Sequence, residues 1–243
     1  MIDVTIATYM RQVQEWHPIQ WMQIAKHTHC SFKMVRICRE GTVHEKWQQA
    51  IDETDTQYVV VVDDDCLVIA DGWLEAILGE LKSTPDAGCI TPIEIKDRET
   101  FEVYFEDRNR LIPPNCPTLV ESAWLPGYMM VIDKERTPGA CVDVNIPHPK
   151  GASDVDFSLT IRRAGFKCYY TSKVCVYHPY KNPVTEQDKL EAREQYEYLS
   201  HKWGKFYTES LNQQAAGTIK LPDVVWRKQT LEDFQYLADK YGI

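Results

Sequence analysis

Long apolar runs are missing from this 243-residue sequence. No stretch approaches the roughly 18–20 consecutive apolar residues of a membrane-spanning helix. The first ten residues, MIDVTIATYM, also lack the basic start and apolar segment that mark a secretory signal peptide. We therefore expect a soluble, cytoplasmic protein without a transmembrane segment.

Closely spaced cysteine pairs are missing as well. The sequence has eight cysteines but no CxxC motif, and several of them lie inside apolar, strand-like runs. Scattered cysteines of this kind are typical of reduced, buried thiols rather than of a disulfide framework. We therefore expect free thiols.

Positive charge is in short supply. Lys and Arg number 27 against 36 Asp and Glu, which gives a formal net charge of -9. A protein that holds nucleic acid by its phosphates needs a basic surface, so we do not expect a nucleic-acid partner. The hydrophobic share of 44% is that of an ordinary globular protein, and the length allows one large domain or two small ones.

The first part of the sequence alternates between strand and helix patterns. Helical patterns cover residues 15–28, 42–53 and 72–82, with Thr42 as an expected N-cap. The β-branched and apolar runs that predict strands cover residues 2–8, 32–38, 57–62 and 87–92. This alternation predicts a parallel sheet covered by helices.

The second part is less regular. Prolines interrupt residues 93–125, and beyond them we expect a helix over 154–164 and strands over 127–133, 167–171 and 173–178. From about residue 184 the sequence is charged and helical, first over 185–206 and then over 230–241. We predict an α/β domain over residues 1–182, in halves 1–92 and 93–182, and a helical extension over 183–243.

Three consecutive aspartates follow the strand expected over 57–62. In the stretch YVVVVDDDC, the carboxylates of Asp63, Asp64 and Asp65 repel one another, and burying them without a partner is costly. Ligands bind at the carboxyl ends of strands in open α/β sheets, and Mg²⁺ and Mn²⁺ prefer carboxylate oxygens. A polar turn is the alternative, because Asp is common after strands. The pattern alone leaves both interpretations open.

A second acidic group and a histidine follow downstream. Asp154 and Asp156 open an expected helix, where the exposed N–H groups and the helix dipole favour carboxylates. A carboxylate beside a cation-bound substrate could instead take a proton from an attacking hydroxyl. His178 ends the last expected strand, where it is either a structural residue or a metal ligand.

Together these pieces resemble the GT-A glycosyltransferases, most closely glycosyltransferase family two. VTIATYMR (4–11) is similar to that family's first strand and nucleotide-lining turn, and YVVVVDDDC (58–66) to its strand ending in the D-x-D motif. WLPGYMMVIDKE (124–135) is similar to its acceptor-side segment, and residues 153–178 to its acidic helix and closing strand with histidine. The resemblance implies a Rossmann-like, mostly parallel central sheet flanked by helices, with a helical C-terminal extension.

The resemblance assigns the half 1–92 to a nucleotide-diphosphate sugar donor. It implies that Mn²⁺ or Mg²⁺ is held by Asp65, His178 and Asp63. It further implies that the nucleotide is bound by Thr8, Tyr9, Arg11, Asp63 and Asp64. The family's uracil-reading acidic turn has no match in FKMVRICREGT (32–42). The base of the donor is therefore open, with a UDP-sugar as the first expectation from the resemblance and a GDP-sugar as the second.

The resemblance assigns the half 93–182 to the acceptor. Asp154 matches the catalytic base, which deprotonates an acceptor hydroxyl for a single, inverting displacement at the anomeric carbon. The residues implied to contact the acceptor are Trp124, Gly127 and Asp156. The acceptor could be a saccharide, a lipid carrier, a protein or a modified nucleobase. Ser153 precedes Asp154 where the family commonly has Glu, and no Q-x-x-R-W motif of a processive synthase occurs.

Other functions remain open at this point. A retaining GT-A transferase would use the same acids and cation, and a non-catalytic relative could bind a nucleotide sugar or saccharide. A nucleotidyltransferase is disfavoured, because ATYMRQVQEW (7–16) has no glycine for a triphosphate-binding loop. The sequence assigns no definite role to Arg162 or His148, and HTHC (27–30) reads as the end of a helix rather than a metal cluster.

Overall fold

The computed structural model describes residues 3–9, 17–37, 40–95, 117–178 and 185–217. The strands in this part of the chain are β1 (Val4–Tyr9), β2 (Lys33–Ile37), β3 (Tyr58–Asp63), β4 (Leu67–Val68), β5 (Ala87–Ile95), β6 (Leu119–Ser122), β7 (Met129–Asp133) and β8 (Lys167–Tyr177). The helices are α1 (His17–His27), α2 (Val43–Asp52), α3 (Trp73–Ser83), α5 (Ser153–Arg163), α6 (Glu186–Trp203) and α7 (Lys205–Gly217).

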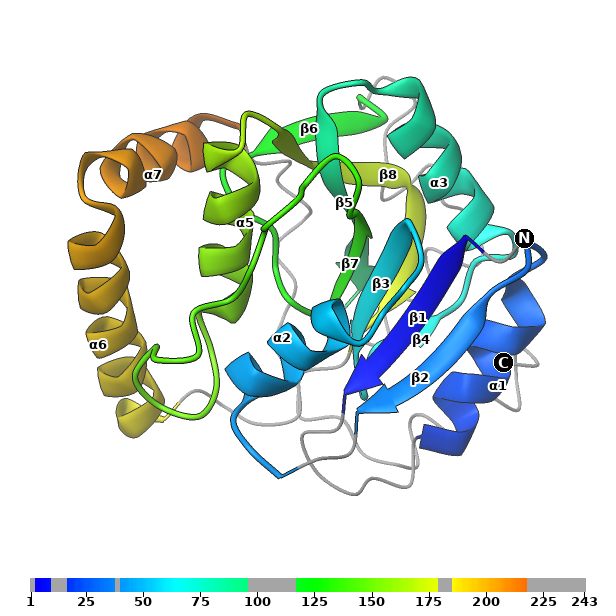
Figure 1. The fold of residues 1–243 in the computed structure, drawn as a ribbon, viewed down its shortest axis with the longest axis horizontal. Helices are drawn as coiled ribbons and strands as arrows, with labels where there is room; N and C mark the ends of the chain where they lie inside the picture. The colour runs from blue at the N-terminus through cyan, green and yellow to red at the C-terminus, as the bar shows by residue number, and fades with distance from the viewer. Residues whose placement is uncertain (1–2, 10–16, 38–39, 96–116, 179–184, 218–243) are drawn as a thin grey trace.

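One sheet joins all of these strands, in the order β2-β1-β3-β7-β5-β8-β4, with β6 paired to β8 (Figure 1). The predicted α/β class with a central sheet flanked by helices is confirmed. Five strands, β1, β2, β3, β5 and β8, run in one direction, so the sheet is mostly parallel as predicted. It is nevertheless mixed, because β7 runs antiparallel to both of its neighbours, β3 and β5. Within the described residues 117–128, strand β6 rather than a helix precedes β7 along the chain.

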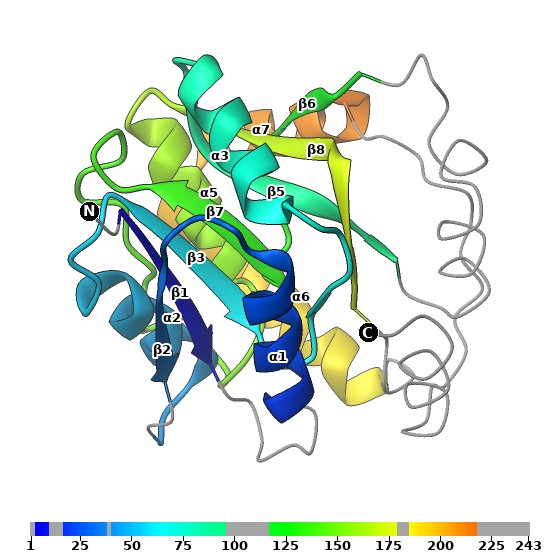
Figure 2. The same cartoon turned by 90° about the vertical axis from the view of Figure 1, so that its right-hand side faces the viewer.

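Strand β3 lies in the middle of the sheet and is buried along its whole length. Its side chains alternate between two hydrophobic clusters, as the period of a strand requires. Val59 and Val61 face the cluster that includes α2 and α5, and Val60 and Val62 face the cluster that includes α1 and α3. The two views show these helix pairs on opposite faces of the sheet (Figures 1 and 2).

Helices α6 and α7 form an outer layer beside α5, at the left of Figure 1. Leu199 of α6 and Tyr207 of α7 are buried in the same cluster as α5. Gly204, with φ +55°, separates the two helices, so the helical run expected over 185–206 is broken at its C-terminal end. The helix expected over 230–241 lies outside the described residues, and the predicted domain limits stay a prediction.

Most local expectations agree with the structure. Thr42 caps α2 through a capping box, in which the Thr42 hydroxyl accepts from the Glu45 N–H and the Glu45 carboxylate accepts from the Thr42 N–H. The two strands expected over 167–171 and 173–178 are one continuous strand, β8. Strand β4 was not expected, because a two-residue strand leaves no periodic pattern to detect.

Two composition-based expectations can be compared with the described residues. No helix in this part of the chain combines the length and the apolarity that crossing a bilayer requires. Six of the cysteines lie in this part and all are free thiols: Cys30, Cys66, Cys89, Cys141, Cys168 and Cys175. Cys38 and Cys116 fall outside it.

Candidate active site and metal centre

The acidic turn that follows β3 is held in place by α1. Asp63 is fully buried, and its N–H donates to the carbonyl of Tyr128 at 2.9 Å. The Cys66 N–H donates to the carbonyl of Asp63 at 3.1 Å and closes the turn. The side-chain amide of Gln20 donates to the carbonyls of both Asp63 and Cys66. Gln20 has no local sequence signal for this role, and the sequence alone did not reveal it.

Three of the predicted ligand residues meet at the end of the sheet. His178 follows β8, and its Nε2 lies 3.2 Å from Oδ1 of Asp65 and 3.8 Å from Oδ2 of Asp63. One potential ligand atom from each residue lies within 4.8 Å of the others, and this is the one such group of three or more found among the described residues. Asp64 is buried in the same turn but does not belong to the group.

The ionisable groups of this cluster strongly affect one another. Burial alone would lower the pKa of His178, but the carboxylates of Asp65 and Glu94 outweigh burial and raise that pKa to about 10. Burial raises the pKa of Asp63 well above its usual value, the carboxylate of Asp65 adds to the shift, and His178 opposes it. Negative charge is therefore crowded at a buried position, where a cation is the natural counter-charge.

The donor set fits a divalent cation. At metal–oxygen distances of about 2.1 Å, neighbouring ligands of one ion are separated by about 3 Å and opposite ligands by about 4 Å. The measured 3.2 and 3.8 Å lie in this range. Carboxylate oxygens suit Mn²⁺ and Mg²⁺, and one imidazole can complete such a site. Asp63, Asp65 and His178 can therefore hold the predicted ion.

A carboxylate and an aromatic ring contact the imidazole of His178. Oε2 of Glu94 lies 2.9 Å from Nδ1 of His178. The ring of Tyr128 stacks on the imidazole, with centroids 5.3 Å apart and 30° between the planes. Neither residue was identified from the sequence, because nothing local to Glu94 or Tyr128 indicates which strand end the fold places beside it.

Asp154 lies at the start of α5, on the same side of the fold as the acidic turn. Its Oδ2 accepts from the Gly127 N–H at 3.0 Å, and its Oδ1 accepts from the Val155 N–H at 2.9 Å. Its charge contributes, after burial and the nearer groups, to the raised pKa of Asp63. The structure thus brings Asp154 within electrostatic range of the candidate metal centre, with Gly127 directly beside it.

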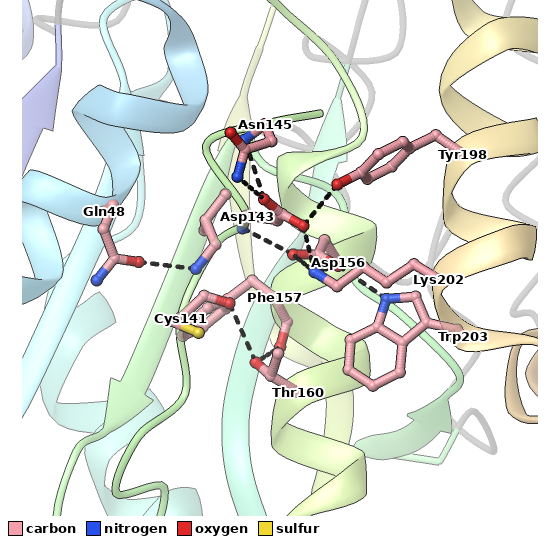
Figure 3. A network of polar contacts seen from close by, with 11 residues as sticks. Gln48, Cys141, Asp143, Asn145, Asp156, Phe157, Thr160, Tyr198, Lys202 and Trp203 are labelled. Carbon is pink, nitrogen blue, oxygen red and sulfur yellow. Dashed lines mark hydrogen bonds and ion pairs between the residues drawn. The ribbon is translucent and has the colours of Figure 1, made fainter. Parts of the chain in front are cut away.

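Asp156 occupies a different environment. Its carboxylate accepts from Lys202 Nζ at 2.8 and 3.0 Å, from Trp203 Nε1 at 2.8 Å and from the Asp143 N–H at 2.8 Å (Figure 3). These contacts join α5 to α6, and the acceptor-binding role expected for Asp156 stays a prediction. Asp154 and Asp156 lie on different faces of α5, because residues two apart do not share a helix face.

The remaining acceptor-side prediction, Trp124, lies against the C-terminal helices. Its ring stacks on Tyr207 of α7, with centroids 6.0 Å apart and an interplanar angle of 18°. Tyr207 is buried in the core, whereas Trp124 is only partly buried and keeps some accessible surface. From Trp124 the chain runs through Leu125 to Gly127, which contacts Asp154.

The predicted nucleotide contacts from β1 are mainly buried. Thr8 accepts a hydrogen bond from Trp21 Nε1 at 3.3 Å. Tyr9 is the register partner of Asp63, and its ring packs edge-on against Trp47 in the core, with centroids 6.1 Å apart. Arg11 lies outside the described residues.

The residues left without a role by the sequence have structural partners. Arg162 donates to the carboxylate of Glu121, to the carbonyl of Ser122 and to the side chain of Gln213. The Nε2 of His148 lies 2.6 Å from the carboxylate of Glu194 on α6. In the HTHC segment, both His27 and His29 lie beside Asp71, at 3.6 and 2.9 Å.

Comparisons with known proteins agree with this geometry. The family model described as "Glycosyl transferase family 2" matches residues 23–142. No curated protein sequence gives a match.

Two solved structures share the fold. GalNAc-T7 with UDP, GalNAc and Mn²⁺ is 11% identical with a TM-score of 0.59, over 99% of this chain and 55% of GalNAc-T7. This chain therefore spans little more than half of GalNAc-T7. The mannosyltransferase PcManGT from Pyrobaculum calidifontis with GDP-Man and Mn²⁺ is 12% identical with a TM-score of 0.53, over 99% of this chain and 79% of PcManGT.

At such identities the structural likeness shows the fold alone. The chain therefore has the GT-A fold, and its residues 23–142 match the model of glycosyl transferase family 2.

Proposed function

We propose that this protein moves a sugar from a nucleotide-diphosphate sugar to an acceptor hydroxyl, with a divalent cation at its centre and inversion at the anomeric carbon. The observation that carries the proposal is the meeting of Asp63, Asp65 and His178 at one end of the sheet, with Asp154 within electrostatic range. Both fold neighbours were solved with Mn²⁺, one with UDP and one with GDP-Man.

The residues of the acidic turn act on the donor. Asp65, His178 and Asp63 would hold the cation, and Gln20 and the closed turn fix the orientation of the acidic turn. When bound, Mn²⁺ or Mg²⁺ supplies Lewis-acid neutralisation of the diphosphate leaving group.

The end of β1 and the acidic turn support the nucleotide. Thr8 and Tyr9 are the last residues of β1 and pair with Val62 and Asp63 of β3, and Asp64 lies in the chain between the cation ligands Asp63 and Asp65. Because the ring of Tyr9 is in the core, its contact with the nucleotide is through its backbone. By this proposal the donor is a UDP-sugar or a GDP-sugar, and the first experiment below decides between them.

Asp154 acts on the acceptor as the general base. The backbone N–H groups of Gly127 and Val155 each hold one of its oxygens, so the carboxylate has a fixed direction. The acceptor hydroxyl gives its proton to Asp154 while its oxygen forms the new bond to the anomeric carbon. The bond from that carbon to the diphosphate oxygen breaks, and the nucleoside diphosphate leaves with the electron pair.

Aromatic side chains line the acceptor side. Trp124, which stacks on Tyr207, lies close to Gly127 along the chain, and Tyr196 of α6 is 46% exposed. Burial raises the pKa of Tyr196, and the charge of Asp154 adds to the shift. Aromatic faces suit the C–H surfaces of sugar rings. A saccharide is the acceptor that these rings favour.

Donor binding is the first test. Thermal unfolding would be measured with UDP-, GDP-, CDP-, ADP- and dTDP-sugars, with and without Mn²⁺, for the wild type, Asp65→Ala and Asp71→Ala. A ligand that binds the folded state raises its apparent stability. We expect a Mn²⁺-dependent shift with one nucleotide in the wild type and in Asp71→Ala, and none in Asp65→Ala. No shift with any donor contradicts the proposal.

The stereochemistry needs a second measurement. Proton NMR of the first product formed from the identified donor gives the configuration at the anomeric carbon, with free water as the acceptor if no other accepts. We expect inversion. Retention of configuration would replace the single displacement by a retaining mechanism while leaving the cation site in place.

A further inference from the structure

The imidazole of His178 is fixed from three directions. Strand β5 lies beside β8 in the sheet (Figure 2), with Glu94 opposite Val176 and Ile95 opposite Tyr177. The His178 N–H donates to the carbonyl of Ile95 at 2.9 Å, which fixes its backbone where β8 ends. The side chain is then held at its Nδ1 by Glu94 and on its ring face by Tyr128.

Tyr128 is itself fixed to two strands. Its hydroxyl donates to the carbonyl of Pro92 on β5, and its carbonyl accepts from the N–H of Asp63 on β3. The ring that packs on His178 therefore cannot tilt without disturbing the backbone of a cation ligand.

The contact at Nδ1 decides what Nε2 can do. A neutral imidazole has one N–H and one lone pair, and the partner of the N–H determines which nitrogen is free to bind a metal. With Glu94 accepting at Nδ1, the neutral form that can bind a cation has its lone pair at Nε2. That nitrogen is the one that faces Asp65 and Asp63.

Charge gives a second reason for the arrangement. Three carboxylates, of Asp63, Asp65 and Glu94, surround one imidazole, and Glu94 and His178 have side chains only 16% and 14% exposed. A third carboxylate would add repulsion at this place if it served only to pair with the histidine. Orienting a histidine toward a cation offsets that cost, as carboxylates do behind metal-binding histidines.

We propose that Glu94 is a positioning residue for the metal centre, which selects the Nδ1–H form of His178 and directs its Nε2 at the cation, with Tyr128 holding the plane of the ring. This inference rests on the proposed function only in that Asp63, Asp65 and His178 bind a divalent cation. It assigns to Glu94 a part in binding that cation without ligating it.

The test is a double-mutant cycle read by Mn²⁺ binding. Free Mn²⁺ would be titrated against the protein by electron paramagnetic resonance for the wild type, Glu94→Gln, His178→Ala and the double variant. Outer-shell carboxylates of this kind are worth about 10–100-fold in metal affinity. We expect Glu94→Gln to weaken Mn²⁺ binding about tenfold or more, and to have no further effect once His178 is Ala.

The cycle separates orientation from simple charge. If Glu94 acted only by its negative charge, its removal would weaken Mn²⁺ binding equally with and without His178, and the inference would be overturned. Glu135→Gln removes one exposed carboxylate beyond the end of β7 and serves as the matched control, with no change expected.

The remaining outcomes are equally decisive. Affinity within twofold of the wild type for Glu94→Gln overturns the inference, while loss of binding in Asp65→Ala would still support the proposed metal centre. If the wild type binds no Mn²⁺, alone or with UDP or GDP, both the metal centre and the inference fail. Circular dichroism of each variant ensures that only folded protein enters the comparison.

Discussion

Leu67 of β4 lies directly opposite Tyr177 of β8. The pairing is antiparallel, so the residues that precede β4 meet the residue that follows β8, and Asp65 Oδ1 comes within 3.2 Å of His178 Nε2. A strand of two residues therefore closes the candidate metal centre, although it contributes little to the sheet.

Replacing the proposed base should separate catalysis from donor binding. We expect Asp154→Asn to lower kcat by roughly 10²–10⁴-fold, because an amide cannot take the hydroxyl proton. Affinity for Mn²⁺ and for the donor should stay within twofold of the wild type. Steady-state kinetics and isothermal titration calorimetry would measure the two quantities.

Asp52→Asn, at an exposed position at the end of α2, is the matched control for this change. Full transfer activity in Asp154→Asn would remove Asp154 from the mechanism.

Two glycine-to-alanine changes should differ in their effect on kcat. A Cβ at Gly127 would lie 3.2 Å from Trp47 Cζ2 and 3.3 Å from Asp154 Cβ, so Gly127→Ala should move the proposed base and lower kcat. Gly79 in α3 has no atom within 4 Å of such a Cβ. Gly79→Ala should leave kcat unchanged and stabilise the fold by about 0.5–1 kcal/mol.

Chemical denaturation and kinetics on both glycine variants would give the comparison. Unchanged kcat in Gly127→Ala would mean that the close approach to Asp154 has no catalytic importance.

Removing the positive charge of Lys202 beside Asp156 should destabilise the protein. Lys202→Met leaves a fully buried carboxylate with only the Trp203 and Asp143 N–H donors, and we expect a loss of about 2 kcal/mol in the free energy of unfolding. Lys189→Met breaks an exposed pair with Glu186 on the same helix and should cost less than about 0.5 kcal/mol. Equal losses in urea denaturation would contradict the role of the α5–α6 network.

His44 should give the stability a dependence on pH. Burial lowers the pKa of His44, opposed by its bond to the His148 carbonyl and by the charges of Asp156, Asp143 and Glu45. The folded-state pKa is therefore below the unfolded value of about 6.5, so below that pH the unfolded chain binds the extra proton. The contribution of His44 is complete above about pH 6.5 and is lost as the pH falls through the folded pKa.

We expect the stability difference between the wild type and His44→Gln to shrink when urea denaturation is repeated from about pH 7 to about pH 5. His201→Gln, an exposed histidine on α6, is the control. A difference that is constant or grows on acidification would show that His44 is not buried as a neutral imidazole.

Sequence patterns predicted those parts of the site that have a local signal. The valine run ending in Asp63 reads as a strand end, and Asp154 reads as the first turn of a helix, so both were placed correctly in the fold. Their order along the chain, with His178 at the end of a strand, was enough to suggest one site.

The parts that were missed depend on contacts between distant segments. Gln20 and Glu94 act through neighbours that only the completed sheet provides, and no spacing around either residue shows it. Asp156 is different, because the two-residue spacing from Asp154 already implied another helix face. Its place against Lys202 is consistent with that geometry.

The network around Asp156 also bears on how this protein can be divided. One helix, α5, carries the proposed base in its first turn and, two residues later, the carboxylate that anchors α6. A fragment ending at residue 182 would uncover that charge and the hydrophobic surface under Leu199. Helices α6 and α7 therefore support α5. Shortening or replacing them would disturb the first turn of α5, which carries the proposed base.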